Sequence, residues 1–350
     1  MRALTVEPGR QNSLRVRDLP VPAPTGTELL VRGLVMGVCG TDHELTGGQY
    51  GWAPAGRDWL VLGHESLGRV EQAPPGSSFS AGDLVAGVVR RPDPVPCGAC
   101  ARGEFDMCRN GRSTERGIKE LDGFGAQFWC VEPDYAVRLE PRLERAGVLM
   151  EPTSVVAKAW EQVDRVGGRS WFEPQRVLVT GAGPIGLLAA LLGTQRGLDV
   201  HLLDQVKDGP KPSLARDIGA TYHTDDARQV IAKLCPDIVI EATGVSDLVF
   251  AAMSGTASYG VVCLTGVSPA GRSVTVDAGA INRDIVLQND AVVGSVNANL
   301  RHFRQAAAAL AQADGDWLDR LITRRVPLDR AAQALESQPD DVKVVVDLTL

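Results

Sequence analysis

The sequence predicts an α/β protein with two domains, one rich in β-strands and one built around a parallel sheet. Its 350 residues are enough for about two domains of ordinary size. Short β-branched runs broken by glycine and proline fill the first half, as at 28–32, 83–89 and 127–131. From about Gln175 onward, strands alternate with helical stretches at short intervals, which is the pattern of βαβ units.

The elements of the second half follow one another in a regular order. A buried strand is predicted at 176–180, and a helix at 185–196 is expected to end at Gly197 in a left-handed cap. The remaining predicted elements are a strand at 199–203, a helix at 213–218, strands at 237–240 and 259–264, helices at 300–313 and 317–322, and a closing strand at 343–346.

The composition disfavours nucleic acid and membranes as partners. The chain has 43 acidic and 36 basic side chains, a net charge of −7, and its arginines are scattered. Apolar runs such as 185–192 are well short of the roughly 20 residues that span a bilayer. The first residues turn polar too early for a secretory signal, so we expect a cytoplasmic protein.

A glycine-rich turn, Gly-Ala-Gly-Pro-Ile-Gly at 181–186, follows a predicted strand and opens a predicted helix. In that context the pattern indicates a dinucleotide-binding site. Gly181 permits the tight turn, Gly183 lets the backbone approach the pyrophosphate, and Gly186 lets the helix pack closely on the strand.

Asp204 ends the next strand, 18 residues beyond Gly186, close to the roughly 20 expected of an acid that bonds the adenosine ribose hydroxyls. A carboxylate at this place repels a 2′-phosphate, so NAD is expected to be favoured over NADP. Lys207 and Lys211 lie nearby in the sequence and would soften this preference.

Three of the seven cysteines, Cys97, Cys100 and Cys108, form a C-x2-C-x7-C knuckle in a proline-rich loop. An odd cysteine count disfavours a disulfide framework, and clustered thiols in a reducing compartment indicate a metal site or catalysis. Three converging thiolates and a fourth ligand bind zinc tetrahedrally, and a site with no open position is structural. The candidates for the fourth ligand are carboxylates of the same loop: Asp93 first, and then Glu104 and Asp106.

Three further segments carry metal-binding side chains: Cys-Gly-Thr-Asp-His at 39–43, Gly-His-Glu at 63–65 and Met-Glu-Pro at 150–152. Together they supply a thiolate, an imidazole and carboxylates, which is the donor set that zinc prefers. The sequence therefore predicts a second zinc site.

With these motifs in order along nearly the whole chain, the sequence resembles the medium-chain, zinc-dependent alcohol and polyol dehydrogenases, most of all their glucose 1-dehydrogenase branch. The matching segments are 37–42, 63–65, the cysteine knuckle, the turn at 181–186, and Val-Val-Gly-Ser-Val-Asn-Ala-Asn at 292–299. The last segment is more typical of the glucose branch than of the superfamily as a whole.

The resemblance implies a GroES-like, β-rich catalytic domain at 1–154 and 295–350, and a Rossmann domain with a doubly wound parallel sheet at 155–294. It implies transfer of a hydride from a secondary or anomeric alcohol of a sugar or cyclic polyol to NAD(P). It also implies a homo-oligomer, either a dimer or a tetramer.

Carried over residue by residue, the resemblance makes Cys39, His64 and Glu151 the ligands of the catalytic zinc, with Glu65 as an adjacent, exchangeable ligand. Thr41 would pass the hydroxyl proton toward solvent, with His43 as the next relay, and Glu115 would reach the substrate hydroxyls. The residues implied at the cofactor are Gly181, Gly183, Pro184, Ile185, Gly186, Asp204 and Gln205 at the nucleotide, and Leu264, Thr265, Gly266, Ser295, Val296 and Asn297 at the nicotinamide.

The chain departs from the sugar enzymes at two places near these residues. Val89 stands before Arg90 where they carry a polar asparagine, and 154–156 is Ser-Val-Val where they carry an acid. Fewer polar partners for sugar hydroxyls favour an alternative, a dehydrogenase or ketoreductase acting on a modified sugar or cyclitol in a specialised biosynthetic pathway. A relative that only binds nucleotide is disfavoured, because the expected zinc ligands are all present.

Overall fold

The computed structural model describes residues 1–269, 271 and 273–350. The chain forms two compact units, one from Met1–Ser154 with Asn297–Leu350 and the other from Val155–Val296. The first boundary falls within helix α2 (Met150–Gly167). The second places Ser295 and Val296 in the second unit, whereas the sequence-based boundaries assign them to the first.

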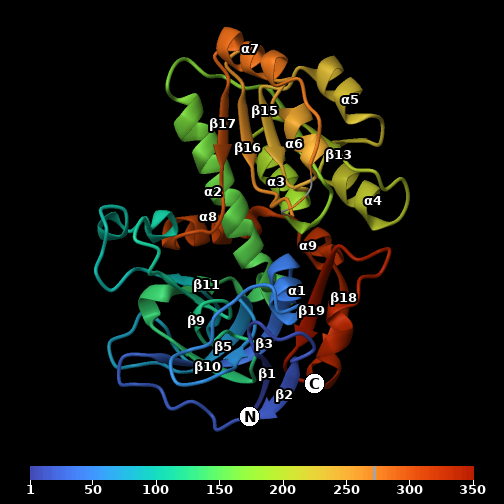
Figure 1. Ribbon diagram of the computed structural model, residues 1–350. Helices are drawn as coiled ribbons and strands as arrows, with labels where there is room; N and C mark the ends of the chain where they lie inside the picture. The colour runs from blue at the N-terminus through green and yellow to red at the C-terminus, as the bar shows by residue number, and fades with distance from the viewer. Residues whose placement is uncertain (270, 272) are drawn as a thin grey trace. The chain divides into compact units, whose positions relative to one another are not determined.

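The first unit consists mainly of antiparallel strands in three sheets, and both chain termini lie in it (Figure 1). Its largest sheet has the order β11-β6-β5-β3-β19-β18, with β10 also paired to β3. These strands are β3 (Leu29–Val38), β5 (Glu65–Gln72), β6 (Leu84–Gly87), β10 (Phe128–Val131), β11 (Ala136–Leu139), β18 (Ile322–Pro327) and β19 (Lys343–Asp347). The smaller sheets are β2-β1-β4 and β7-β8-β9, made of β1 (Arg2–Val6), β2 (Arg15–Asp18), β4 (Leu60–Val61), β7 (Arg90–Arg91), β8 (Thr114–Arg116) and β9 (Glu120–Leu121).

Strand β3 is the centre of this unit. Its residues Leu29, Leu30 and Val31 are all buried, which is why this part of the sequence is a continuous apolar run without polar alternation. Trp129 and Phe124 pack against the same core, with their ring centroids 4.8 Å apart. The helices of this unit are α1 (Gly40–Thr46), α8 (Leu300–Gln312) and α9 (Gly315–Leu321), together with the start of α2.

The second unit contains a six-stranded sheet in which every pair of neighbours is parallel. Its order is β14-β13-β12-β15-β16-β17. The strands are β12 (Arg176–Thr180), β13 (Asp199–Leu203), β14 (Thr221–His223), β15 (Ile238–Glu241), β16 (Val261–Leu264) and β17 (Ala291–Gly294). Numbered from β12, this is the 3-2-1-4-5-6 order of a dinucleotide-binding sheet, so the predicted doubly wound α/β fold is confirmed.

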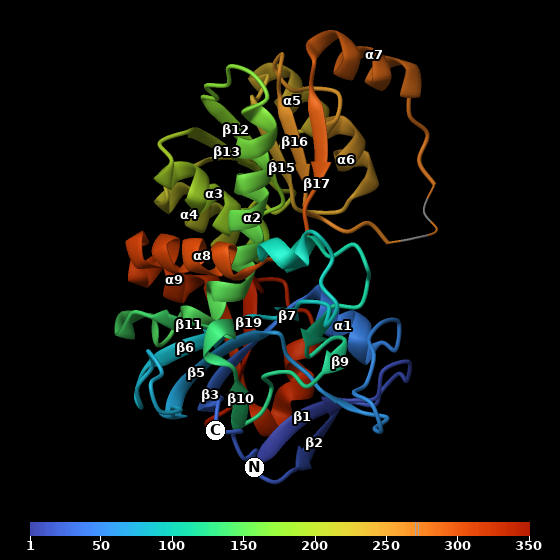
Figure 2. The same ribbon diagram turned by 90° about the vertical axis from the view of Figure 1, so that its left-hand side faces the viewer.

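Helices cover both faces of this sheet. Leu178, Val239 and Val262 pack in one cluster with residues of α5 (Ala227–Leu234) and α6 (Ser246–Ala252). Val179 has the opposite orientation in β12, and a Cβ added at Gly186 of α3 (Pro184–Gln195) would lie 3.5 Å from its Cγ1 atom. Figure 2 shows α3 and α4 (Pro210–Asp217) on one side of the sheet and α5 and α6 on the other. Helix α7 (Ala278–Gln288) precedes β17.

The predicted elements were most accurate at the glycine-rich turn. The strands expected at 176–180 and 199–203 coincide with β12 and β13. The helix expected at 213–218 begins earlier, at Pro210, because proline fits the first turn of a helix, where its missing N–H is not needed. Helices α2, α5, α6 and α7 were not predicted from the sequence. Among the described residues, no helix is long and apolar enough to cross a membrane.

Replacing Gly186 by alanine should destabilise the second unit. A Cβ at this position would lie 1.7 Å from the Gly181 carbonyl oxygen, a backbone atom that has no room to move. We expect a loss of about 1–3 kcal/mol in the free energy of unfolding, measured by urea denaturation.

Gly183→Ala is the matched control for this variant. Its backbone is extended, with φ −77°, and its Cβ would meet nothing within 4 Å among the described residues. Its stability should stay within about 0.5 kcal/mol of wild type, while its affinity for the nucleotide falls. Equal stability of wild type and Gly186→Ala would contradict the close contact described here.

Candidate metal centres and nucleotide site

Cys39 lies between strand β3 and helix α1, immediately before the first helical residue. The Asp42 carboxylate accepts a hydrogen bond of 2.9 Å from the Cys39 backbone N–H, which fixes the backbone that carries the thiol. Thr41 and His43 follow on the same helix, Thr41 half-buried and His43 exposed.

Glu65 is the first residue of strand β5 and His64 directly precedes it, after a turn that requires glycine. Gly63 has φ +99°, and a Cβ there would lie 2.4 Å from the Met36 sulfur. On the neighbouring strand, a Cβ at Gly37 would lie 1.9 Å from a carboxylate oxygen of Glu65. Gly37 therefore leaves the space that the Glu65 side chain occupies, and Gly63 leaves the space for the Met36 side chain.

The structure brings Cys39, His64 and Glu65 together, with one ligand atom of each lying within 4.8 Å of the others. The Cys39 Sγ atom is 3.0 Å from His64 Nε2. The other ring nitrogen of His64, Nδ1, is buried and lies 3.7 Å from an oxygen of Asp42. A metal-binding histidine usually has such a carboxylate at its second nitrogen, so the orientation suits ligation through Nε2.

The electrostatics of this cluster also fit a divalent cation. Burial raises the pKa of the Asp42 carboxyl, and burial is also the main cause that raises the pKa of Glu151 to about 7. Burial disfavours protonation of His64, yet the Cys39 thiol and Asp42 outweigh it and raise the pKa of His64 well above its usual value. A bound cation would relieve this concentration of buried negative charge, and a thiolate, an imidazole and carboxylates are donors that zinc accepts.

Glu151 lies near this cluster but outside its set of converging ligand atoms. It lies in the first turn of α2, partly exposed, and interacts electrostatically with His64 and Glu65. Its carboxylate is not one of the three converging ligand atoms, whereas that of Glu65 is. The roles of these two glutamates as metal ligands therefore stay predictions.

The sequence did not reveal the cation that neutralises Glu65. Lys343, in β19, is 1% exposed and donates from Nζ to Glu65 Oε1 at 2.6 Å and to the Val38 carbonyl at 2.9 Å. Lysine at the start of the apolar run Lys-Val-Val-Val was the available signal, since a fully buried lysine is rare without a partner.

Glu115 forms a second polar cluster in the first unit. It is buried in β8, and its Oε1 atom accepts hydrogen bonds from Arg90 Nε at 2.9 Å and from Asn297 Nδ2 at 2.8 Å. Arg90 Nη2 lies 2.8 Å from the same oxygen. The structure thus hydrogen-bonds Glu115, which was expected at the substrate, to Asn297, which was expected at the nicotinamide.

The knuckle cysteines Cys97, Cys100 and Cys108 also converge within 4.8 Å, and the Cys97 and Cys100 sulfurs are 3.6 Å apart. The backbone N–H of Arg109 is the main cause that lowers the pKa of Cys97 to about 6. A thiol that ionises this readily is prepared to bind a metal.

The carboxylates that were expected to supply the fourth ligand of the knuckle interact with other side chains and backbone groups instead. Asp93 accepts hydrogen bonds from the Val95 N–H at 2.8 Å and from Asn110 Nδ2 at 2.9 Å, and it is not among the converging ligand atoms. Asp106 accepts from Asn299 Nδ2 at 2.8 Å, and Glu104 lies 3.8 Å from Arg301. The three-cysteine part of the knuckle is assembled, and its fourth ligand stays a prediction.

The glycine-rich turn lies between β12 and α3, at the point where the strand order of the sheet reverses. Gly181 has φ +90°, and Pro184 is the first residue of α3, with Ile185 after it. The Asp204 carboxylate accepts hydrogen bonds from the Ala182 N–H at 2.7 Å and the Val206 N–H at 2.9 Å. Asp204 therefore ties the end of β13 to the turn, and Gln205 beside it is exposed.

The other predicted cofactor residues of the second unit lie at strand ends. Leu264 ends β16, and its carbonyl accepts a hydrogen bond from the Ser295 N–H at 2.9 Å. The Val296 carbonyl accepts from Lys158 Nζ at 2.8 Å. Thr265 donates its hydroxyl to the Glu241 carbonyl at 2.8 Å, and the Gly266 N–H donates to the same oxygen at 3.0 Å.

Glu241 is a second residue that the sequence did not single out. It is fully buried at the end of β15, and its Oε1 atom accepts from the Thr180 hydroxyl at 3.2 Å and the Thr243 N–H at 2.8 Å. The Gly244 N–H also bonds this carboxylate. An acid at the end of an apolar strand was the available signal, and the structure uses it to hold the loops of the switch point.

Comparison with known proteins places this chain among dehydrogenases. Residues 25–141 match the family model for the alcohol dehydrogenase GroES-like domain, and residues 144–348 match the model for the glucose dehydrogenase C-terminus. The chain is 41% identical to the glucose 1-dehydrogenase of Methanocella arvoryzae and 40% identical to that of Halobacterium salinarum, covering 99% and 95% of both chains respectively. Its structure is similar to that of Haloferax mediterranei glucose dehydrogenase in complex with NADP, Zn and gluconolactone, with a TM-score of 0.89, 32% identity and 99% of each chain covered.

Proposed function

This chain belongs to the zinc-dependent medium-chain dehydrogenases, in the branch of the glucose 1-dehydrogenases, and we propose that its substrate is a neutral sugar oxidised at the anomeric carbon. It is an NAD(P)-dependent zinc enzyme of sugars or polyols. The convergence of Cys39, His64 and Glu65 is the observation that carries the zinc chemistry. Glucose is the first substrate to test, because the similar Haloferax enzyme was solved with gluconolactone.

At the metal centre, Cys39 and His64 would hold zinc, with Glu65 or Glu151 as carboxylate ligand. Zinc bound at such a site supplies Lewis acidity toward a substrate oxygen, and the nicotinamide supplies the hydride acceptor. Asp42 holds the Cys39 backbone and faces the second nitrogen of His64, so both donors keep their orientation.

The proton of the substrate hydroxyl would leave through Thr41. This residue lies two positions after Cys39 on α1 and is half-buried, and His43, two residues farther on, is exposed to solvent and would be the next group on the route. The two ring nitrogens of a histidine can accept and donate a proton, which suits His43 to the outer position.

Glu115 would bind a second hydroxyl of the substrate. Among the residues that the structure describes, Arg90 and Asn297 both bond its Oε1 atom, which leaves Oε2 to accept from the sugar. A buried acceptor of this kind discriminates against a substrate that lacks the hydroxyl, because the acceptor then stays unpaired.

A modified sugar or cyclitol is the second candidate substrate. Val89 is buried directly before Arg90, and the Ser154 hydroxyl is already bonded to the Glu151 carbonyl at 2.6 Å. At both positions, this chain offers fewer polar groups to substrate hydroxyls than the sugar enzymes offer, because those enzymes carry an asparagine and an acid at these positions. A substrate with fewer free hydroxyls, oxidised or reduced in a specialised pathway, would suit them.

We further propose a homo-oligomeric, cytoplasmic enzyme. Strand β17 forms one end of its sheet, and nearby α7 exposes Val286 and Leu287, both 62% accessible, so this edge offers apolar surface to a second copy. The seven cysteines are all free thiols, which supports a reducing compartment.

The function is tested by following absorbance at 340 nm with the zinc-loaded protein, NAD or NADP, and a panel of sugars, cyclitols and simple alcohols. Cys39→Ser should abolish turnover and still bind the nucleotide. Glu115→Ala should lower kcat/KM for glucose at least about tenfold more than for its deoxy analogues, because only the hydroxyl-bearing substrate loses a bond. Oxidation of cyclohexanol as efficient as that of every sugar would overturn the sugar assignment.

We propose that the enzyme prefers NAD over NADP, and that Lys211 makes this preference smaller. The Asp204 carboxylate would repel a 2′-phosphate, but Lys211 Nζ lies 3.4 Å from it and offsets part of its charge. Asp204→Asn removes the charge and keeps an acceptor oxygen for only one of the Ala182 and Val206 N–H groups, which bond different oxygens of the carboxylate. This variant should lower the ratio of kcat/KM for NAD to that for NADP by about tenfold, and adding Gln205→Arg should lower it further.

Lys211→Met is the opposing control, because it removes a cation next to the expected 2′-phosphate and should raise the same ratio. A wild-type enzyme that turns over NADP as well as or better than NAD would overturn the preference.

Losing the cation beside Glu65 should destabilise the first unit strongly. Lys343→Met leaves the Glu65 carboxylate buried without its ion-pair partner, which costs about 3–5 kcal/mol of unfolding free energy in urea denaturation of the metal-free protein. Lys233→Met, at an exposed position of α5, is the control and should change stability by less than about 0.5 kcal/mol.

A double variant separates the charge from the packing of the lysine. Glu65→Gln combined with Lys343→Met removes both charges and should recover most of the lost stability. If Lys343→Met alone were as stable as wild type, the ion pair would not be what holds Glu65.

A further inference from the structure

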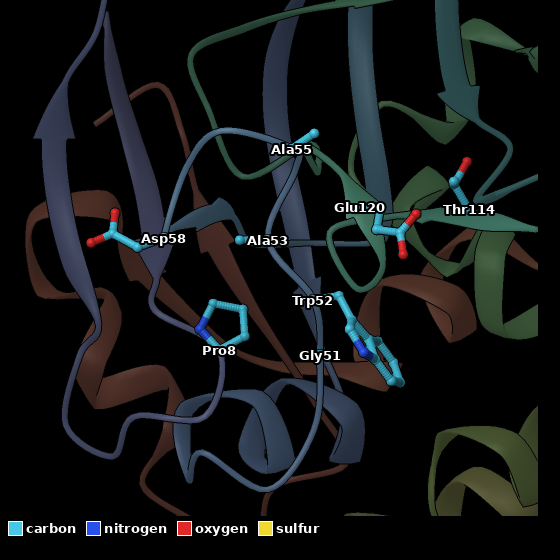
Figure 3. A pocket seen from close by; sticks show the side chains of 8 residues that line it. All are labelled: Pro8, Gly51, Trp52, Ala53, Ala55, Asp58, Thr114 and Glu120. Carbon is cyan, nitrogen blue, oxygen red and sulfur yellow. The ribbon is translucent and has the colours of Figure 1, made fainter. Parts of the chain in front are cut away.

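A pocket of about 670 Å³ lies in the first unit beside the strands that carry Glu115. Figure 3 shows the Trp52 indole and the Glu120 carboxylate close together in its wall, with Thr114 beyond them and Pro8 and Asp58 on the other side. The size is within the range of small-molecule sites. An aromatic ring, two carboxylates and a hydroxyl make the wall partly apolar and partly hydrogen-bonding.

Trp52 is presented to this pocket on a fixed backbone. Its N–H donates to the Ile118 carbonyl at 3.0 Å, and its carbonyl accepts from the Glu120 N–H at 2.9 Å. The side chain is nevertheless 46% exposed. An exposed indole on an ordered backbone binds a ligand with little further loss of conformational freedom.

Three observations connect the pocket to Glu115. Thr114 precedes Glu115 in β8, and Glu120 is the register partner of Glu115 across the β8–β9 pair. The Tyr50 ring lies edge-on to Trp52 with centroids 5.1 Å apart. Partial burial raises the pKa of the Tyr50 phenol, and the Glu115 carboxylate raises it further, so Tyr50 contacts Trp52 and is within electrostatic range of the candidate sugar acid.

Glu120 has a backbone conformation that is unfavourable for a side-chain residue. Its φ is +59°, in the left-handed region that favours glycine, yet the side chain is exposed. Such strain persists where the surrounding structure imposes it, and it is common at ligand-binding positions. Here it holds a carboxylate at the edge of the Trp52 ring.

This set of groups suits a neutral sugar ring. The C–H face of a pyranose is apolar and packs on an aromatic ring, while its equatorial hydroxyls donate to carboxylates at the rim. Asp58 and Glu120 would repel a phosphate or carboxylate ligand. The Lys119 Nζ atom lies 5.8 Å from the indole centroid, so a polar group can reach this ring.

We propose that the pocket is an outer carbohydrate subsite, in which Trp52 stacks on the second ring of a disaccharide whose reducing-end unit occupies the site at Cys39, His64 and Glu115. The inference rests on the proposed function, since the reducing-end unit is the sugar that is oxidised. It enlarges the substrate class from monosaccharides to reducing disaccharides.

The test compares kcat/KM for glucose with kcat/KM for cellobiose and maltose, in wild type and in Trp52→Ala. Wild type should use at least one disaccharide as well as glucose. Trp52→Ala should lower kcat/KM for that disaccharide about tenfold, which corresponds to about 1.4 kcal/mol, and leave glucose within about twofold. Trp52→Phe should restore most of the loss, and Glu120→Gln should reproduce part of it.

Trp171→Ala is the matched control, because Trp171 is a 77% exposed tryptophan of the second unit and should change neither substrate. Binding of cellobiose and maltose to wild type and Trp52→Ala is measured separately by isothermal titration without cofactor, and at least one should bind wild type more tightly.

The outcomes separate this proposal from the one it rests on. If wild type oxidises glucose but neither disaccharide, or if Trp52→Ala changes kcat/KM equally for all three sugars, the outer subsite is overturned and the proposed function still stands. Disaccharide binding that depends on Trp52, without oxidation of any sugar, would support a carbohydrate site and overturn the proposed function.

Discussion

A carboxylate as deeply buried as that of Glu65 needs a cation beside it, because an unpaired charge is costly in a protein interior, and Lys343 provides that cation from the far end of the chain. The pair joins β5 to β19, two strands that each flank β3, and Lys343 also bonds the carbonyl of Val38, directly before Cys39. One ammonium group therefore fixes both the Glu65 side chain and the backbone next to the candidate metal ligand. Burial raises the pKa of the Asp42 and Glu151 carboxyls in the same cluster, and a divalent ion bound there would favour their charged forms.

The second unit also contains a buried acid, but hydrogen-bond donors stabilise it in place of a cation. Glu241 is also fully buried, but its carboxylate is satisfied by N–H and hydroxyl donors of Thr180, Thr243 and Gly244. An anion held in this way stabilises loop conformations rather than a metal, because its oxygens are already used. Both units thus place a buried acid at a strand end, and the supply of donors around it decides whether it supports a backbone or a metal centre.

The motifs that are continuous in sequence were predictable, and the contacts between distant segments were not. The turn at 181–186 carries its own geometry in its glycines, so strand, turn and helix were placed correctly. Asp93 was expected at the knuckle because it is close in sequence, but Asn110 and Val95 take its oxygens, and that competition appears only in the folded loop. The bonds from Arg90 and Asn297 to Glu115 span residues far apart along the chain, and no local pattern predicts them.

The backbone packing around His64 limits where this site can vary. A Cβ at Gly37 would meet Glu65 at 1.9 Å, one at Gly63 would meet Met36 at 2.4 Å, and one at Gly117 would meet the Gly63 carbonyl at 2.4 Å. Side chains cannot be added at these positions without moving the backbone that holds the metal donors. Changes of substrate must therefore come from residues outside this packed region, and the exposed Tyr50 and Trp52 are positions of that kind. The rigidity that orients the zinc donors thus confines substrate selection to the surrounding loops, where a side chain can change without disturbing the metal centre.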